Sequence, residues 1–497
     1  MITAVGSDLT IRPDRATFEE VARAWPMVPM WAELLADTCT PVGAFGAIAS
    51  DGPGVVLESA EQSERWGRYS FVSGRPAAMI VGDDEGIHLH DVARELPLRE
   101  RAVGRVDTTA ALRLVRAALR APRIPELPTL SGGLVGFLAY EAAGLLDGHP
   151  YPTGGGTACS PIAMHVVDRA VVFDHWSQRL YLVVHVPSGT RYETGLTALE
   201  ELADLIALGE RPHLASPHES SVSVSSAYPE PERFREMVVR AKAKVRAGDI
   251  FQAVLSRRLT FSAPAGALPI YRRLRAINPS PYMFFLRMNG IELAGSSPEP
   301  LVRVEGRRVV TRPIAGTRPR GDDDAADLRL ERELRADPKE RAEHAMLVDL
   351  ARNDLGRVCS PGSIRPTELM TVERFSSVMH LVSTVEGELA EGRDALDALV
   401  AAFPAGTVTG APKRRAMEII AAEEQLARGP YAGAAGYLSF SGDMDFCITI
   451  RTAIVRDGIG SVQAGAGVVS DSDPEREFLE TESKAAAVLA AANGGER

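Results

Sequence analysis

Cysteine and aromatic residues are scarce in this sequence. Its 497 residues include four cysteines, and aromatic residues make up 6% of the chain. The cysteines, Cys39, Cys159, Cys359 and Cys447, lie far apart, and none is part of a C-x-x-C pair. Their spacing therefore indicates neither a zinc ribbon nor a disulfide framework.

Excess positive charge and long apolar runs are also lacking. The formal net charge of −11 argues against nucleic acid or an acidic membrane surface as the main partner. It does not argue against an anionic small molecule, because local fields decide that interaction. No stretch approaches 18 uninterrupted apolar residues, and residues 1–15 have no apolar signal-peptide core. We therefore expect a cytoplasmic protein with no membrane contact.

The composition is that of a globular protein with a sizeable core, because 45% of the residues are hydrophobic and 24% are charged. A Ser/Pro-rich stretch, residues 216–232, predicts a linker between an N-terminal half (1–215) and a C-terminal half (233–497). Apolar runs predict hairpins over 170–186, over 282–297 with a turn at Asn289-Gly290, and around Glu305-Gly306. Helices are expected over 230–249, over about 325–357 and at the end of the chain. This order predicts an α+β fold, in which antiparallel sheets pack as a sandwich covered by helices.

Two pairs of glutamates have the spacing of a shared helix face. Glu340 and Glu343 form one pair, and Glu477 and Glu480, in the segment EREFLETESK, form the other. Like charges at this spacing repel each other. The glutamates are either solvated or paired with neighbours such as Lys339, or the two helices hold one divalent ion together. Mg²⁺ suits such a site because it prefers carboxylate, substrate and water oxygens.

Two glycine-containing stretches are candidates for anion binding. Gly465 and Gly467 precede the second acidic pair and would let backbone N–H groups approach an anion, although a tight turn has the same pattern. The stretch FPAGTVTGAPKRRAMEII (403–420) is not a nucleotide-binding loop, because its lysine does not follow a glycine and Pro412 lacks an N–H group. Thr407 and Thr409 remain as hydrogen-bond donors.

Three further residues have two interpretations each. Arg451 lies in an alternating strand pattern, DFCITIRTAIV, and is either a surface residue or a bidentate clamp for a carboxylate. His380, among apolar residues, is either a core residue or an acid–base group. Glu299, which follows a proline, is either a surface carboxylate or a catalytic acid. These residues alone indicate a divalent-cation site facing an anionic substrate, but no particular reaction.

Several stretches together resemble the chorismate-utilising enzymes, and most closely the large subunits (component I) of the anthranilate synthase branch. They are RPIAGTRPRG (312–321), ERAEHAMLVDLARNDLGRV (340–358), VMHLVSTVEGEL (378–389), FPAGTVTGAPKRRAMEII (403–420), YAGAAGYLSFSGDMDFCITIRTA (431–453) and QAGAGVVSDSDPEREFLETESKA (463–485). They span nearly the whole C-terminal half in the family's order. The stretches 55–74 and 132–144 resemble its more variable regulatory half.

The resemblance implies an active site for chorismate, which is a dicarboxylate. Mg²⁺ would be held by glutamates matching Glu343, Glu477 and Glu480, with Glu340 close by. Glu299 matches the general acid that protonates the departing 4-hydroxyl while ammonia adds at C2, and His380 matches a residue implicated in the later pyruvate elimination. Positions that match other contacts in the family's site are Gly316, Thr317, Thr407, Tyr431, Arg451, Gly465, Ala466, Gly467 and Lys484.

Two positions indicate the branch of the family. Relatives that add water carry a lysine base where this chain has Gln252, and aminodeoxychorismate synthases carry a nucleophilic lysine where it has Ala315. Ammonia needs no strong base, so the absence of both lysines favours direct amination to anthranilate. A hydroxylating or isomerising relative and a non-catalytic tryptophan sensor are the alternatives.

The resemblance also implies partners. No cysteine lies in a G-x-C-x-G elbow, so ammonia would come from glutamine through a separate amidotransferase subunit, and an oligomer is expected. Tryptophan would act as a feedback inhibitor. Its pocket resembles positions in both halves of the chain: Leu57, Glu58, Ser59, Pro281, Tyr282, Met283 and Cys447.

Overall fold

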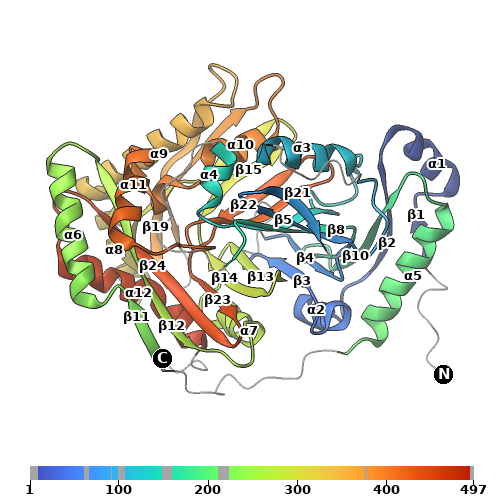
Figure 1. The fold of residues 1–497 in the computed structure, drawn as a ribbon, viewed down its shortest axis with the longest axis horizontal. Coiled ribbons are helices and arrows are strands. Elements are labelled where there is room, and N and C mark those ends of the chain that lie inside the picture. The colour runs from blue at the N-terminus through green and yellow to red at the C-terminus, as the bar shows by residue number, and fades with distance from the viewer. Residues whose placement is uncertain are drawn as a thin grey trace.

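Two large antiparallel sheets form the centre of the molecule (Figure 1). The computed structural model describes residues 9–60, 67–90, 92–98, 107–147, 159–210, 223–374 and 378–492. The first sheet has the order β1 (Ile11–Arg12), β2 (Met27–Leu35), β10 (Arg179–Pro187), β9 (Arg169–Asp174), β4 (Tyr69–Gly74), β3 (Gly54–Glu58), β13 (Tyr282–Met288), β14 (Ile291–Ser297), β23 (Thr452–Arg456), β24 (Ile459–Val468), β12 (Gln252–Ser262) and β11 (Val224–Tyr228), with β20 (Gly410–Ala411) also on β12.

The second sheet lies against the first. Its order is β17 (Ile314–Pro319), β19 (Val378–Glu388), β16 (Arg308–Thr311), β15 (Pro300–Glu305), β22 (Met444–Ile448), β21 (Ala434–Ser439), β7 (Gly133–Leu138), β8 (Ile162–Val167), β5 (Ala78–Asp83) and β6 (Gly86–His90), with β18 (Arg365–Arg374) also on β19. Side chains of both sheets, such as Phe137 and Cys447 from the second and Phe284 and Leu293 from the first, share one buried core. The predicted α+β sandwich is confirmed.

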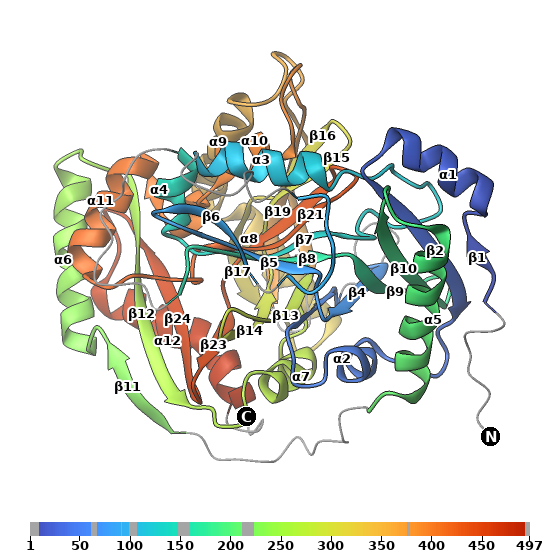
Figure 2. The same cartoon turned by 45° about the vertical axis from the view of Figure 1, so that its right-hand side comes forward.

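Helices cover the outer faces of the two sheets (Figure 2). They are α1 (Arg15–Ala24), α2 (Pro41–Ala49), α3 (Thr108–Ala118), α4 (Ala142–Asp147), α5 (Tyr192–Leu208), α6 (Pro231–Arg246), α7 (Leu268–Ile277), α8 (Asp324–Ala336), α9 (Pro338–Gly356), α10 (Ala395–Ala402), α11 (Lys413–Glu424) and α12 (Pro474–Ala492), with a 3-10 turn, η3 (Gly406–Val408). Side chains of α2, α5, α7 and α12 pack on the first sheet, and those of α3, α4, α9 and α10 pack on the second. No described helix has the length and apolarity needed to cross a membrane.

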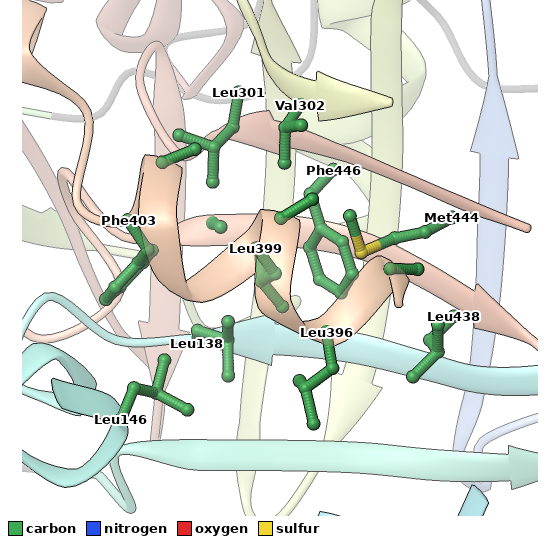
Figure 3. Packing of buried hydrophobic residues seen from close by; sticks show 14 of the residues in the cluster. Leu138, Leu146, Leu301, Val302, Leu396, Leu399, Phe403, Leu438, Met444 and Phe446 are labelled. Atoms are coloured by element: carbon green, nitrogen blue, oxygen red, sulfur yellow. The ribbon is translucent and has the colours of Figure 1, made fainter. Parts of the chain in front are cut away.

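The packing around α10 explains why the sequences of the neighbouring strands of the second sheet are continuous apolar runs. Leu396 and Leu399 of α10 lie against Leu138, Leu438 and Phe446 of the second sheet (Figure 3). The neighbouring residue on β7, Phe137, points to the opposite face and enters the core between the sheets. Both faces of these strands are therefore buried, which removes the alternation of polar and apolar residues that a half-exposed strand has.

The two halves of the sequence are joined within both sheets. β3 pairs with β13 in the first sheet, and β7 pairs with β21 in the second. Of the expected linker, residues 216–222 lie outside the described residues, residues 224–228 form β11, and α6 begins at Pro231. Strands from both halves therefore build each sheet together.

Local patterns located the three predicted hairpins in the sequence. The β9–β10 and β13–β14 hairpins are confirmed, and Asn289 and Gly290 both have the positive φ that a tight hairpin turn needs. The next turn is shifted by one residue, because Glu305 pairs with Arg308 and leaves Gly306 and Arg307 as the loop.

The long helix expected over 325–357 is wrong. It is divided at Asp337, which ends α8 and caps α9 by accepting a hydrogen bond from the Lys339 N–H at 2.9 Å. Pro338 occupies the first turn of α9, where its missing N–H costs nothing.

Candidate active site

The carboxylates of EREFLETESK divide between two faces of α12. Glu475 accepts a hydrogen bond from Arg235 at 2.5 Å, and Glu482 forms an ion pair with the buried Arg257. Glu477 lies on the other face, where burial raises the pKa of its carboxyl and the charge of Glu480 raises it further. Glu475 and Glu482 are therefore bound by arginines of other elements, whereas Glu480 pairs with Lys484 and lies close enough to Glu477 for the two charges to interact.

Helix α9 brings a second set of carboxylates to the same place. Burial raises the pKa of Glu343, and the negative charges of Glu340 and Glu480 act in the same direction. Glu340 itself pairs with Arg318 at 3.2 Å, not with the sequence neighbours considered as partners. Lys484 lies 2.6 Å from Glu480 and also donates to the Gly465 carbonyl at 2.9 Å. The acidic faces of α9 and α12 thus meet beside β24.

This donor set fits Mg²⁺. Among the described residues, no group of three His, Cys, Asp or Glu side chains is arranged as a ready-made metal cage. Mg²⁺ does not need one, because one or two carboxylates plus substrate oxygens and water complete its coordination. Burial raises the pKa of Glu343 and Glu477, and the charges of neighbouring carboxylates raise it further, so a divalent cation would relieve both effects.

Glu299 lies at the junction of β14 and β15, and its side chain faces inward. Burial raises the pKa of its carboxyl to about 7, opposed by Thr407 and by the charges of Lys484 and Arg451. The Ile448 N–H donates to the Glu299 carbonyl at 3.0 Å and fixes the backbone. Thr407 in η3 lines a cavity with Glu299, and its hydroxyl is buried beside that carboxyl. Glu299 is therefore not a surface carboxylate.

The strand expected around Arg451 is wrong. The chain leaves the second sheet after Ile448 and enters the first sheet at Thr452, so residues 449–451 connect β22 to β23. Arg451 has a φ of 52°, and its carbonyl accepts a hydrogen bond from the Ser296 N–H at 3.2 Å. Burial lowers the pKa of its guanidinium, which the negative charge of Glu299 opposes. The crossover places a cation beside the candidate acid, which a continuous strand would not do.

His380 lies on β19 opposite β17. Its Nδ1 lies 3.0 Å from the Gly316 carbonyl, which can only accept, so this nitrogen carries the proton of the neutral ring. Burial lowers the pKa of the imidazole, and the charge of Arg451 lowers it further. Thr317 pairs with His380 through its backbone. A Cβ on Gly316 would lie 3.0 Å from Glu340 Oε2, so the glycine lets β17 approach the carboxylate closely.

Gly465, Ala466 and Gly467 belong to strand β24 and not to a turn. They pair with Ser256, Leu255 and Val254 of β12. A Cβ on Gly465 would lie 2.6 Å from the Tyr431 hydroxyl, and one on Gly467 would lie 2.6 Å from Gln252 Nε2. A side chain at either position would collide with these groups, so the two glycines let Tyr431 and Gln252 approach β24 closely.

The seven residues matched to an inhibitor pocket line a single cavity. Its volume is about 330 Å³, within the range of small-molecule sites. It lies between the sheets, and Tyr282 on its wall donates to Asp445 at 3.0 Å. The residues concerned are Leu57, Glu58, Ser59, Pro281, Tyr282, Met283 and Cys447.

Sequence reasoning missed two of the groups that surround the predicted residues. Arg318 pairs with Glu340, and Ser472 hydrogen-bonds with Glu477. Lys339, which faces Glu343 and Glu477, could be found, and was considered as a partner, from its place one residue before Glu340. Arg318 could not, because it lies on a different element and no local pattern connects the two.

Comparisons with known proteins give the family. The model of the chorismate binding enzymes matches residues 56–490. The chain is 47% identical to anthranilate synthase component 1 of Streptomyces coelicolor over 97% of this chain and 92% of that protein, and 41% identical to that of Mycolicibacterium smegmatis over 98% and 94%.

Solved structures agree with this assignment. Anthranilate synthase component I of Streptococcus pneumoniae superposes with a TM-score of 0.75 at 32% identity, over 92% of this chain and 99% of that one. The menaquinone-specific isochorismate synthase of Escherichia coli has a TM-score of 0.70 at 21% identity over 96% and 99%, which shows a shared fold. The resemblance found in the sequence is confirmed: the chain belongs to the chorismate binding enzymes, and among them to the anthranilate synthase component 1 proteins.

Proposed function

We propose that this chain is the large subunit that converts chorismate and ammonia into anthranilate, the first committed step of tryptophan biosynthesis, in a Mg²⁺-dependent reaction. The observation that carries the proposal is the setting of Glu299. A carboxyl with a pKa of about 7 lies among Thr407, Arg451 and Lys484, so an acid and two cations converge on one point. This arrangement suits a dianionic substrate that must lose a hydroxyl group.

In the first step ammonia adds at C2, the double bond shifts, and the C4–O bond breaks. The protonated Glu299 gives its proton to the departing oxygen, which leaves as water. A positioned acid of this kind contributes roughly 10²–10⁴-fold to the rate. Arg451 is a cation that can hold a carboxylate with two parallel hydrogen bonds. The hydroxyl of Thr407 and the backbone of Gly465–Gly467 orient the substrate.

In the second step C2 loses its proton, the bond from the ring to the enolpyruvyl oxygen breaks, the enolpyruvyl methylene carbon gains a proton to give pyruvate, and the ring becomes aromatic. His380 is suited to accept a proton because burial lowers the pKa of its imidazole and keeps it neutral at pH 7. Its Nδ1–H donates to the Gly316 carbonyl, which fixes the orientation of the ring. Glu343, Glu477 and Glu480, with Glu340 beside them, would hold Mg²⁺. When bound, the ion offsets the negative charge of the substrate carboxylates.

A hydroxylating relative is the second candidate function, and Gln252 argues against it. Its side chain is 7% exposed and approaches Gly467, at the position where water-adding relatives carry a lysine base. An amide cannot take a proton from water at neutral pH. Ala315 likewise offers no nucleophile on β17.

The direct test mixes the purified chain with chorismate, Mg²⁺ and an ammonium salt at mildly alkaline pH. We expect the blue fluorescence of anthranilate to appear, and to disappear when EDTA is added. Glutamine in place of the ammonium salt should give no product until a glutamine amidotransferase subunit is supplied. Chorismate consumed without fluorescence would favour the hydroxylating alternative, and no consumption by a folded protein would favour a sensor.

Feedback by tryptophan is part of the proposal, and it rests on the cavity between the sheets. β22 connects this cavity to the catalytic residues, since Cys447 lines the cavity and the next residue, Ile448, donates its N–H to Glu299. Tryptophan that prefers one packing of the sheets would shift the population away from the form that binds chorismate.

Leu57→Ala is expected to raise the tryptophan concentration for half-inhibition by roughly 10-fold, because a side chain of this size contributes 1–3 kcal/mol to a hydrophobic pocket. Activity without tryptophan should change less than about 3-fold. Steady-state assays over a tryptophan titration measure both quantities. Val55→Ala on the same strand is the control, because Val55 does not line the cavity. Equal inhibition of both variants would remove the cavity assignment.

The amidotransferase partner, a cytoplasmic location and oligomer formation remain predictions. Gel filtration of the chain alone and with a purified amidotransferase subunit would test two of them directly.

A further inference from the structure

A buried ion pair lies beneath the candidate site and has no role in the proposed chemistry. The side chains of Arg428 and Glu424 are 1% and 3% exposed. Arg428 donates from Nε and Nη2 to the two carboxylate oxygens at 2.9 Å and 2.6 Å. Burying a charged side chain costs free energy unless further hydrogen bonds satisfy it. The other hydrogen bonds of Arg428 and Glu424 therefore show which parts of the protein the pair holds in place.

The other donors of Arg428 connect two elements of the site. Nη1 donates to the Val408 carbonyl at 2.7 Å, and Nη2 donates to the Val254 carbonyl at 2.7 Å. Val408 follows Thr407 in η3, and Val254 lies opposite Gly467 in the β12–β24 pair. One rigid guanidinium therefore sets the distance between the turn that carries Thr407 and strand β12, which pairs with the Gly465–Gly467 segment of β24.

Glu424 holds the same strand from the other side of the pair. Its Oε1 accepts from the backbone N–H and the hydroxyl of Ser256, both at 2.8 Å. Ser256 lies opposite Gly465, and Gln463 of β24 donates to the Ser256 hydroxyl at 2.8 Å. The carboxylate thus fixes both β12 and β24 where they pass the site.

Tyr431 contacts the pair as well. The guanidinium carbon of Arg428 lies 5.5 Å from the centre of the Tyr431 ring and 4.7 Å from that of Tyr140. The Tyr431 hydroxyl reaches the backbone at Gly465, as the close approach there shows. Three candidate substrate contacts on separate elements are therefore supported by one ion pair.

We propose that Arg428 and Glu424 are positioning residues that set the spacing of Thr407, Tyr431 and the Gly465–Gly467 backbone for catalysis. This inference rests on the proposed function, because it assigns the pair to that same site. Neither side chain reaches the substrate. A lysine at position 428 would keep the charge, but its single nitrogen has three N–H donors and could not span the four acceptor atoms that the planar guanidinium reaches.

The test compares Arg428→Met, Arg428→Lys and the double variant Glu424→Leu/Arg428→Met with the wild-type chain. Misplacement of catalytic groups by about 1 Å can cost 10²-fold. We therefore expect kcat for anthranilate formation to fall about 100-fold in all three. The double variant should melt closer to wild type than Arg428→Met does, because it leaves no buried charge unpaired. Arg287→Met, at the Arg287–Glu292 pair of the β13–β14 hairpin, is the control and should keep wild-type kcat.

The double variant separates positioning from stability. If its kcat recovers together with its melting temperature, or if Arg287→Met loses as much kcat as Arg428→Met, the pair is only a stabilising contact and the proposal is wrong. Hydrogen exchange gives a readout without turnover: amides of 405–411 and 463–468 should exchange at least 10-fold faster in the double variant, and those of 282–297 should not change. If the wild-type chain makes no anthranilate, the proposed function is wrong. The positioning role is tested separately: it is wrong if the amide hydrogen-exchange rates of the double variant equal those of the wild type.

Discussion

Glu299→Gln is expected to lower kcat for anthranilate formation by roughly 10²–10⁴-fold, because glutamine keeps the shape of the side chain but has no proton to give to the leaving hydroxyl. Chorismate binding should change little. Steady-state kinetics with saturating ammonium salt measure kcat. Fluorescence quenching or calorimetric titration measures the affinity for chorismate. Glu388→Gln, at an exposed position of β19, is the matched control and should keep wild-type activity. A Glu299→Gln variant within 5-fold of wild type would show that another group is the acid.

The pH dependence follows from the direction of the shift. Burial raises the pKa of Glu299 to about 7, so the carboxyl carries its proton below that pH and loses it above. We expect kcat of the wild-type chain to decline as the pH rises through about 7. Each point must be compared at equal free ammonia, because ammonium deprotonates over the same range. A profile that stays flat up to pH 9 would contradict the role of Glu299.

The same shift affects stability. A carboxyl with a raised pKa in the folded state contributes stability that is present below its unfolded pKa and is lost as the pH rises through its folded pKa. For Glu299 this window runs from about 4.5 to about 7 and corresponds to a contribution on the order of 3 kcal/mol. Glu299→Gln should therefore melt above wild type at pH 8, and this difference should shrink toward pH 5. Thermal melts at both pH values measure it.

The elements that the sequence predicted well are those set by short-range chemistry. Asn289-Gly290 requires a hairpin turn with two positive φ values, and the structure has one there. The acidic pairs on α9 and α12 were found because spacing of three residues places side chains on one helix face. Such patterns need no knowledge of the rest of the chain.

What sequence reasoning could not predict depends on long-range contacts. DFCITIRTAIV alternates like one strand, but residues 449–451 cross between two sheets, and only the paired partners of β22 and β23 reveal the crossing. Glu424 and Ser256 are 168 positions apart, so no periodicity connects them. The break at Asp337 is different, because Asp-Pro is a recognisable helix start within an otherwise continuous helical pattern.

Residues of EREFLETESK should respond in three distinct ways to the same Glu→Gln change. Glu477→Gln removes an inward-facing carboxylate, so we expect the Mg²⁺ concentration for half-maximal activity to rise roughly 10–100-fold. Glu475→Gln removes only an exposed ion pair with Arg235, and such pairs contribute little. Its Mg²⁺ requirement should stay within about 2-fold of wild type. Glu482→Gln leaves the buried Arg257 without its partner and should lower the melting temperature instead.

Melting in EDTA tests the assignment without turnover. Burial and the charge of Glu480 raise the pKa of Glu477, so its ionised form destabilises the metal-free protein above that pKa. Glu477→Gln should therefore melt higher than wild type in EDTA at pH 8 and gain less from added Mg²⁺, whereas Glu475→Gln should follow wild type in both conditions. If Glu477→Gln and Glu475→Gln need the same Mg²⁺ concentration and melt alike in EDTA, the inward face of α12 does not bind the ion. The positive charges of Lys484 and Lys339, which face Glu477, would then offset the repulsion between the carboxylates in place of a metal ion.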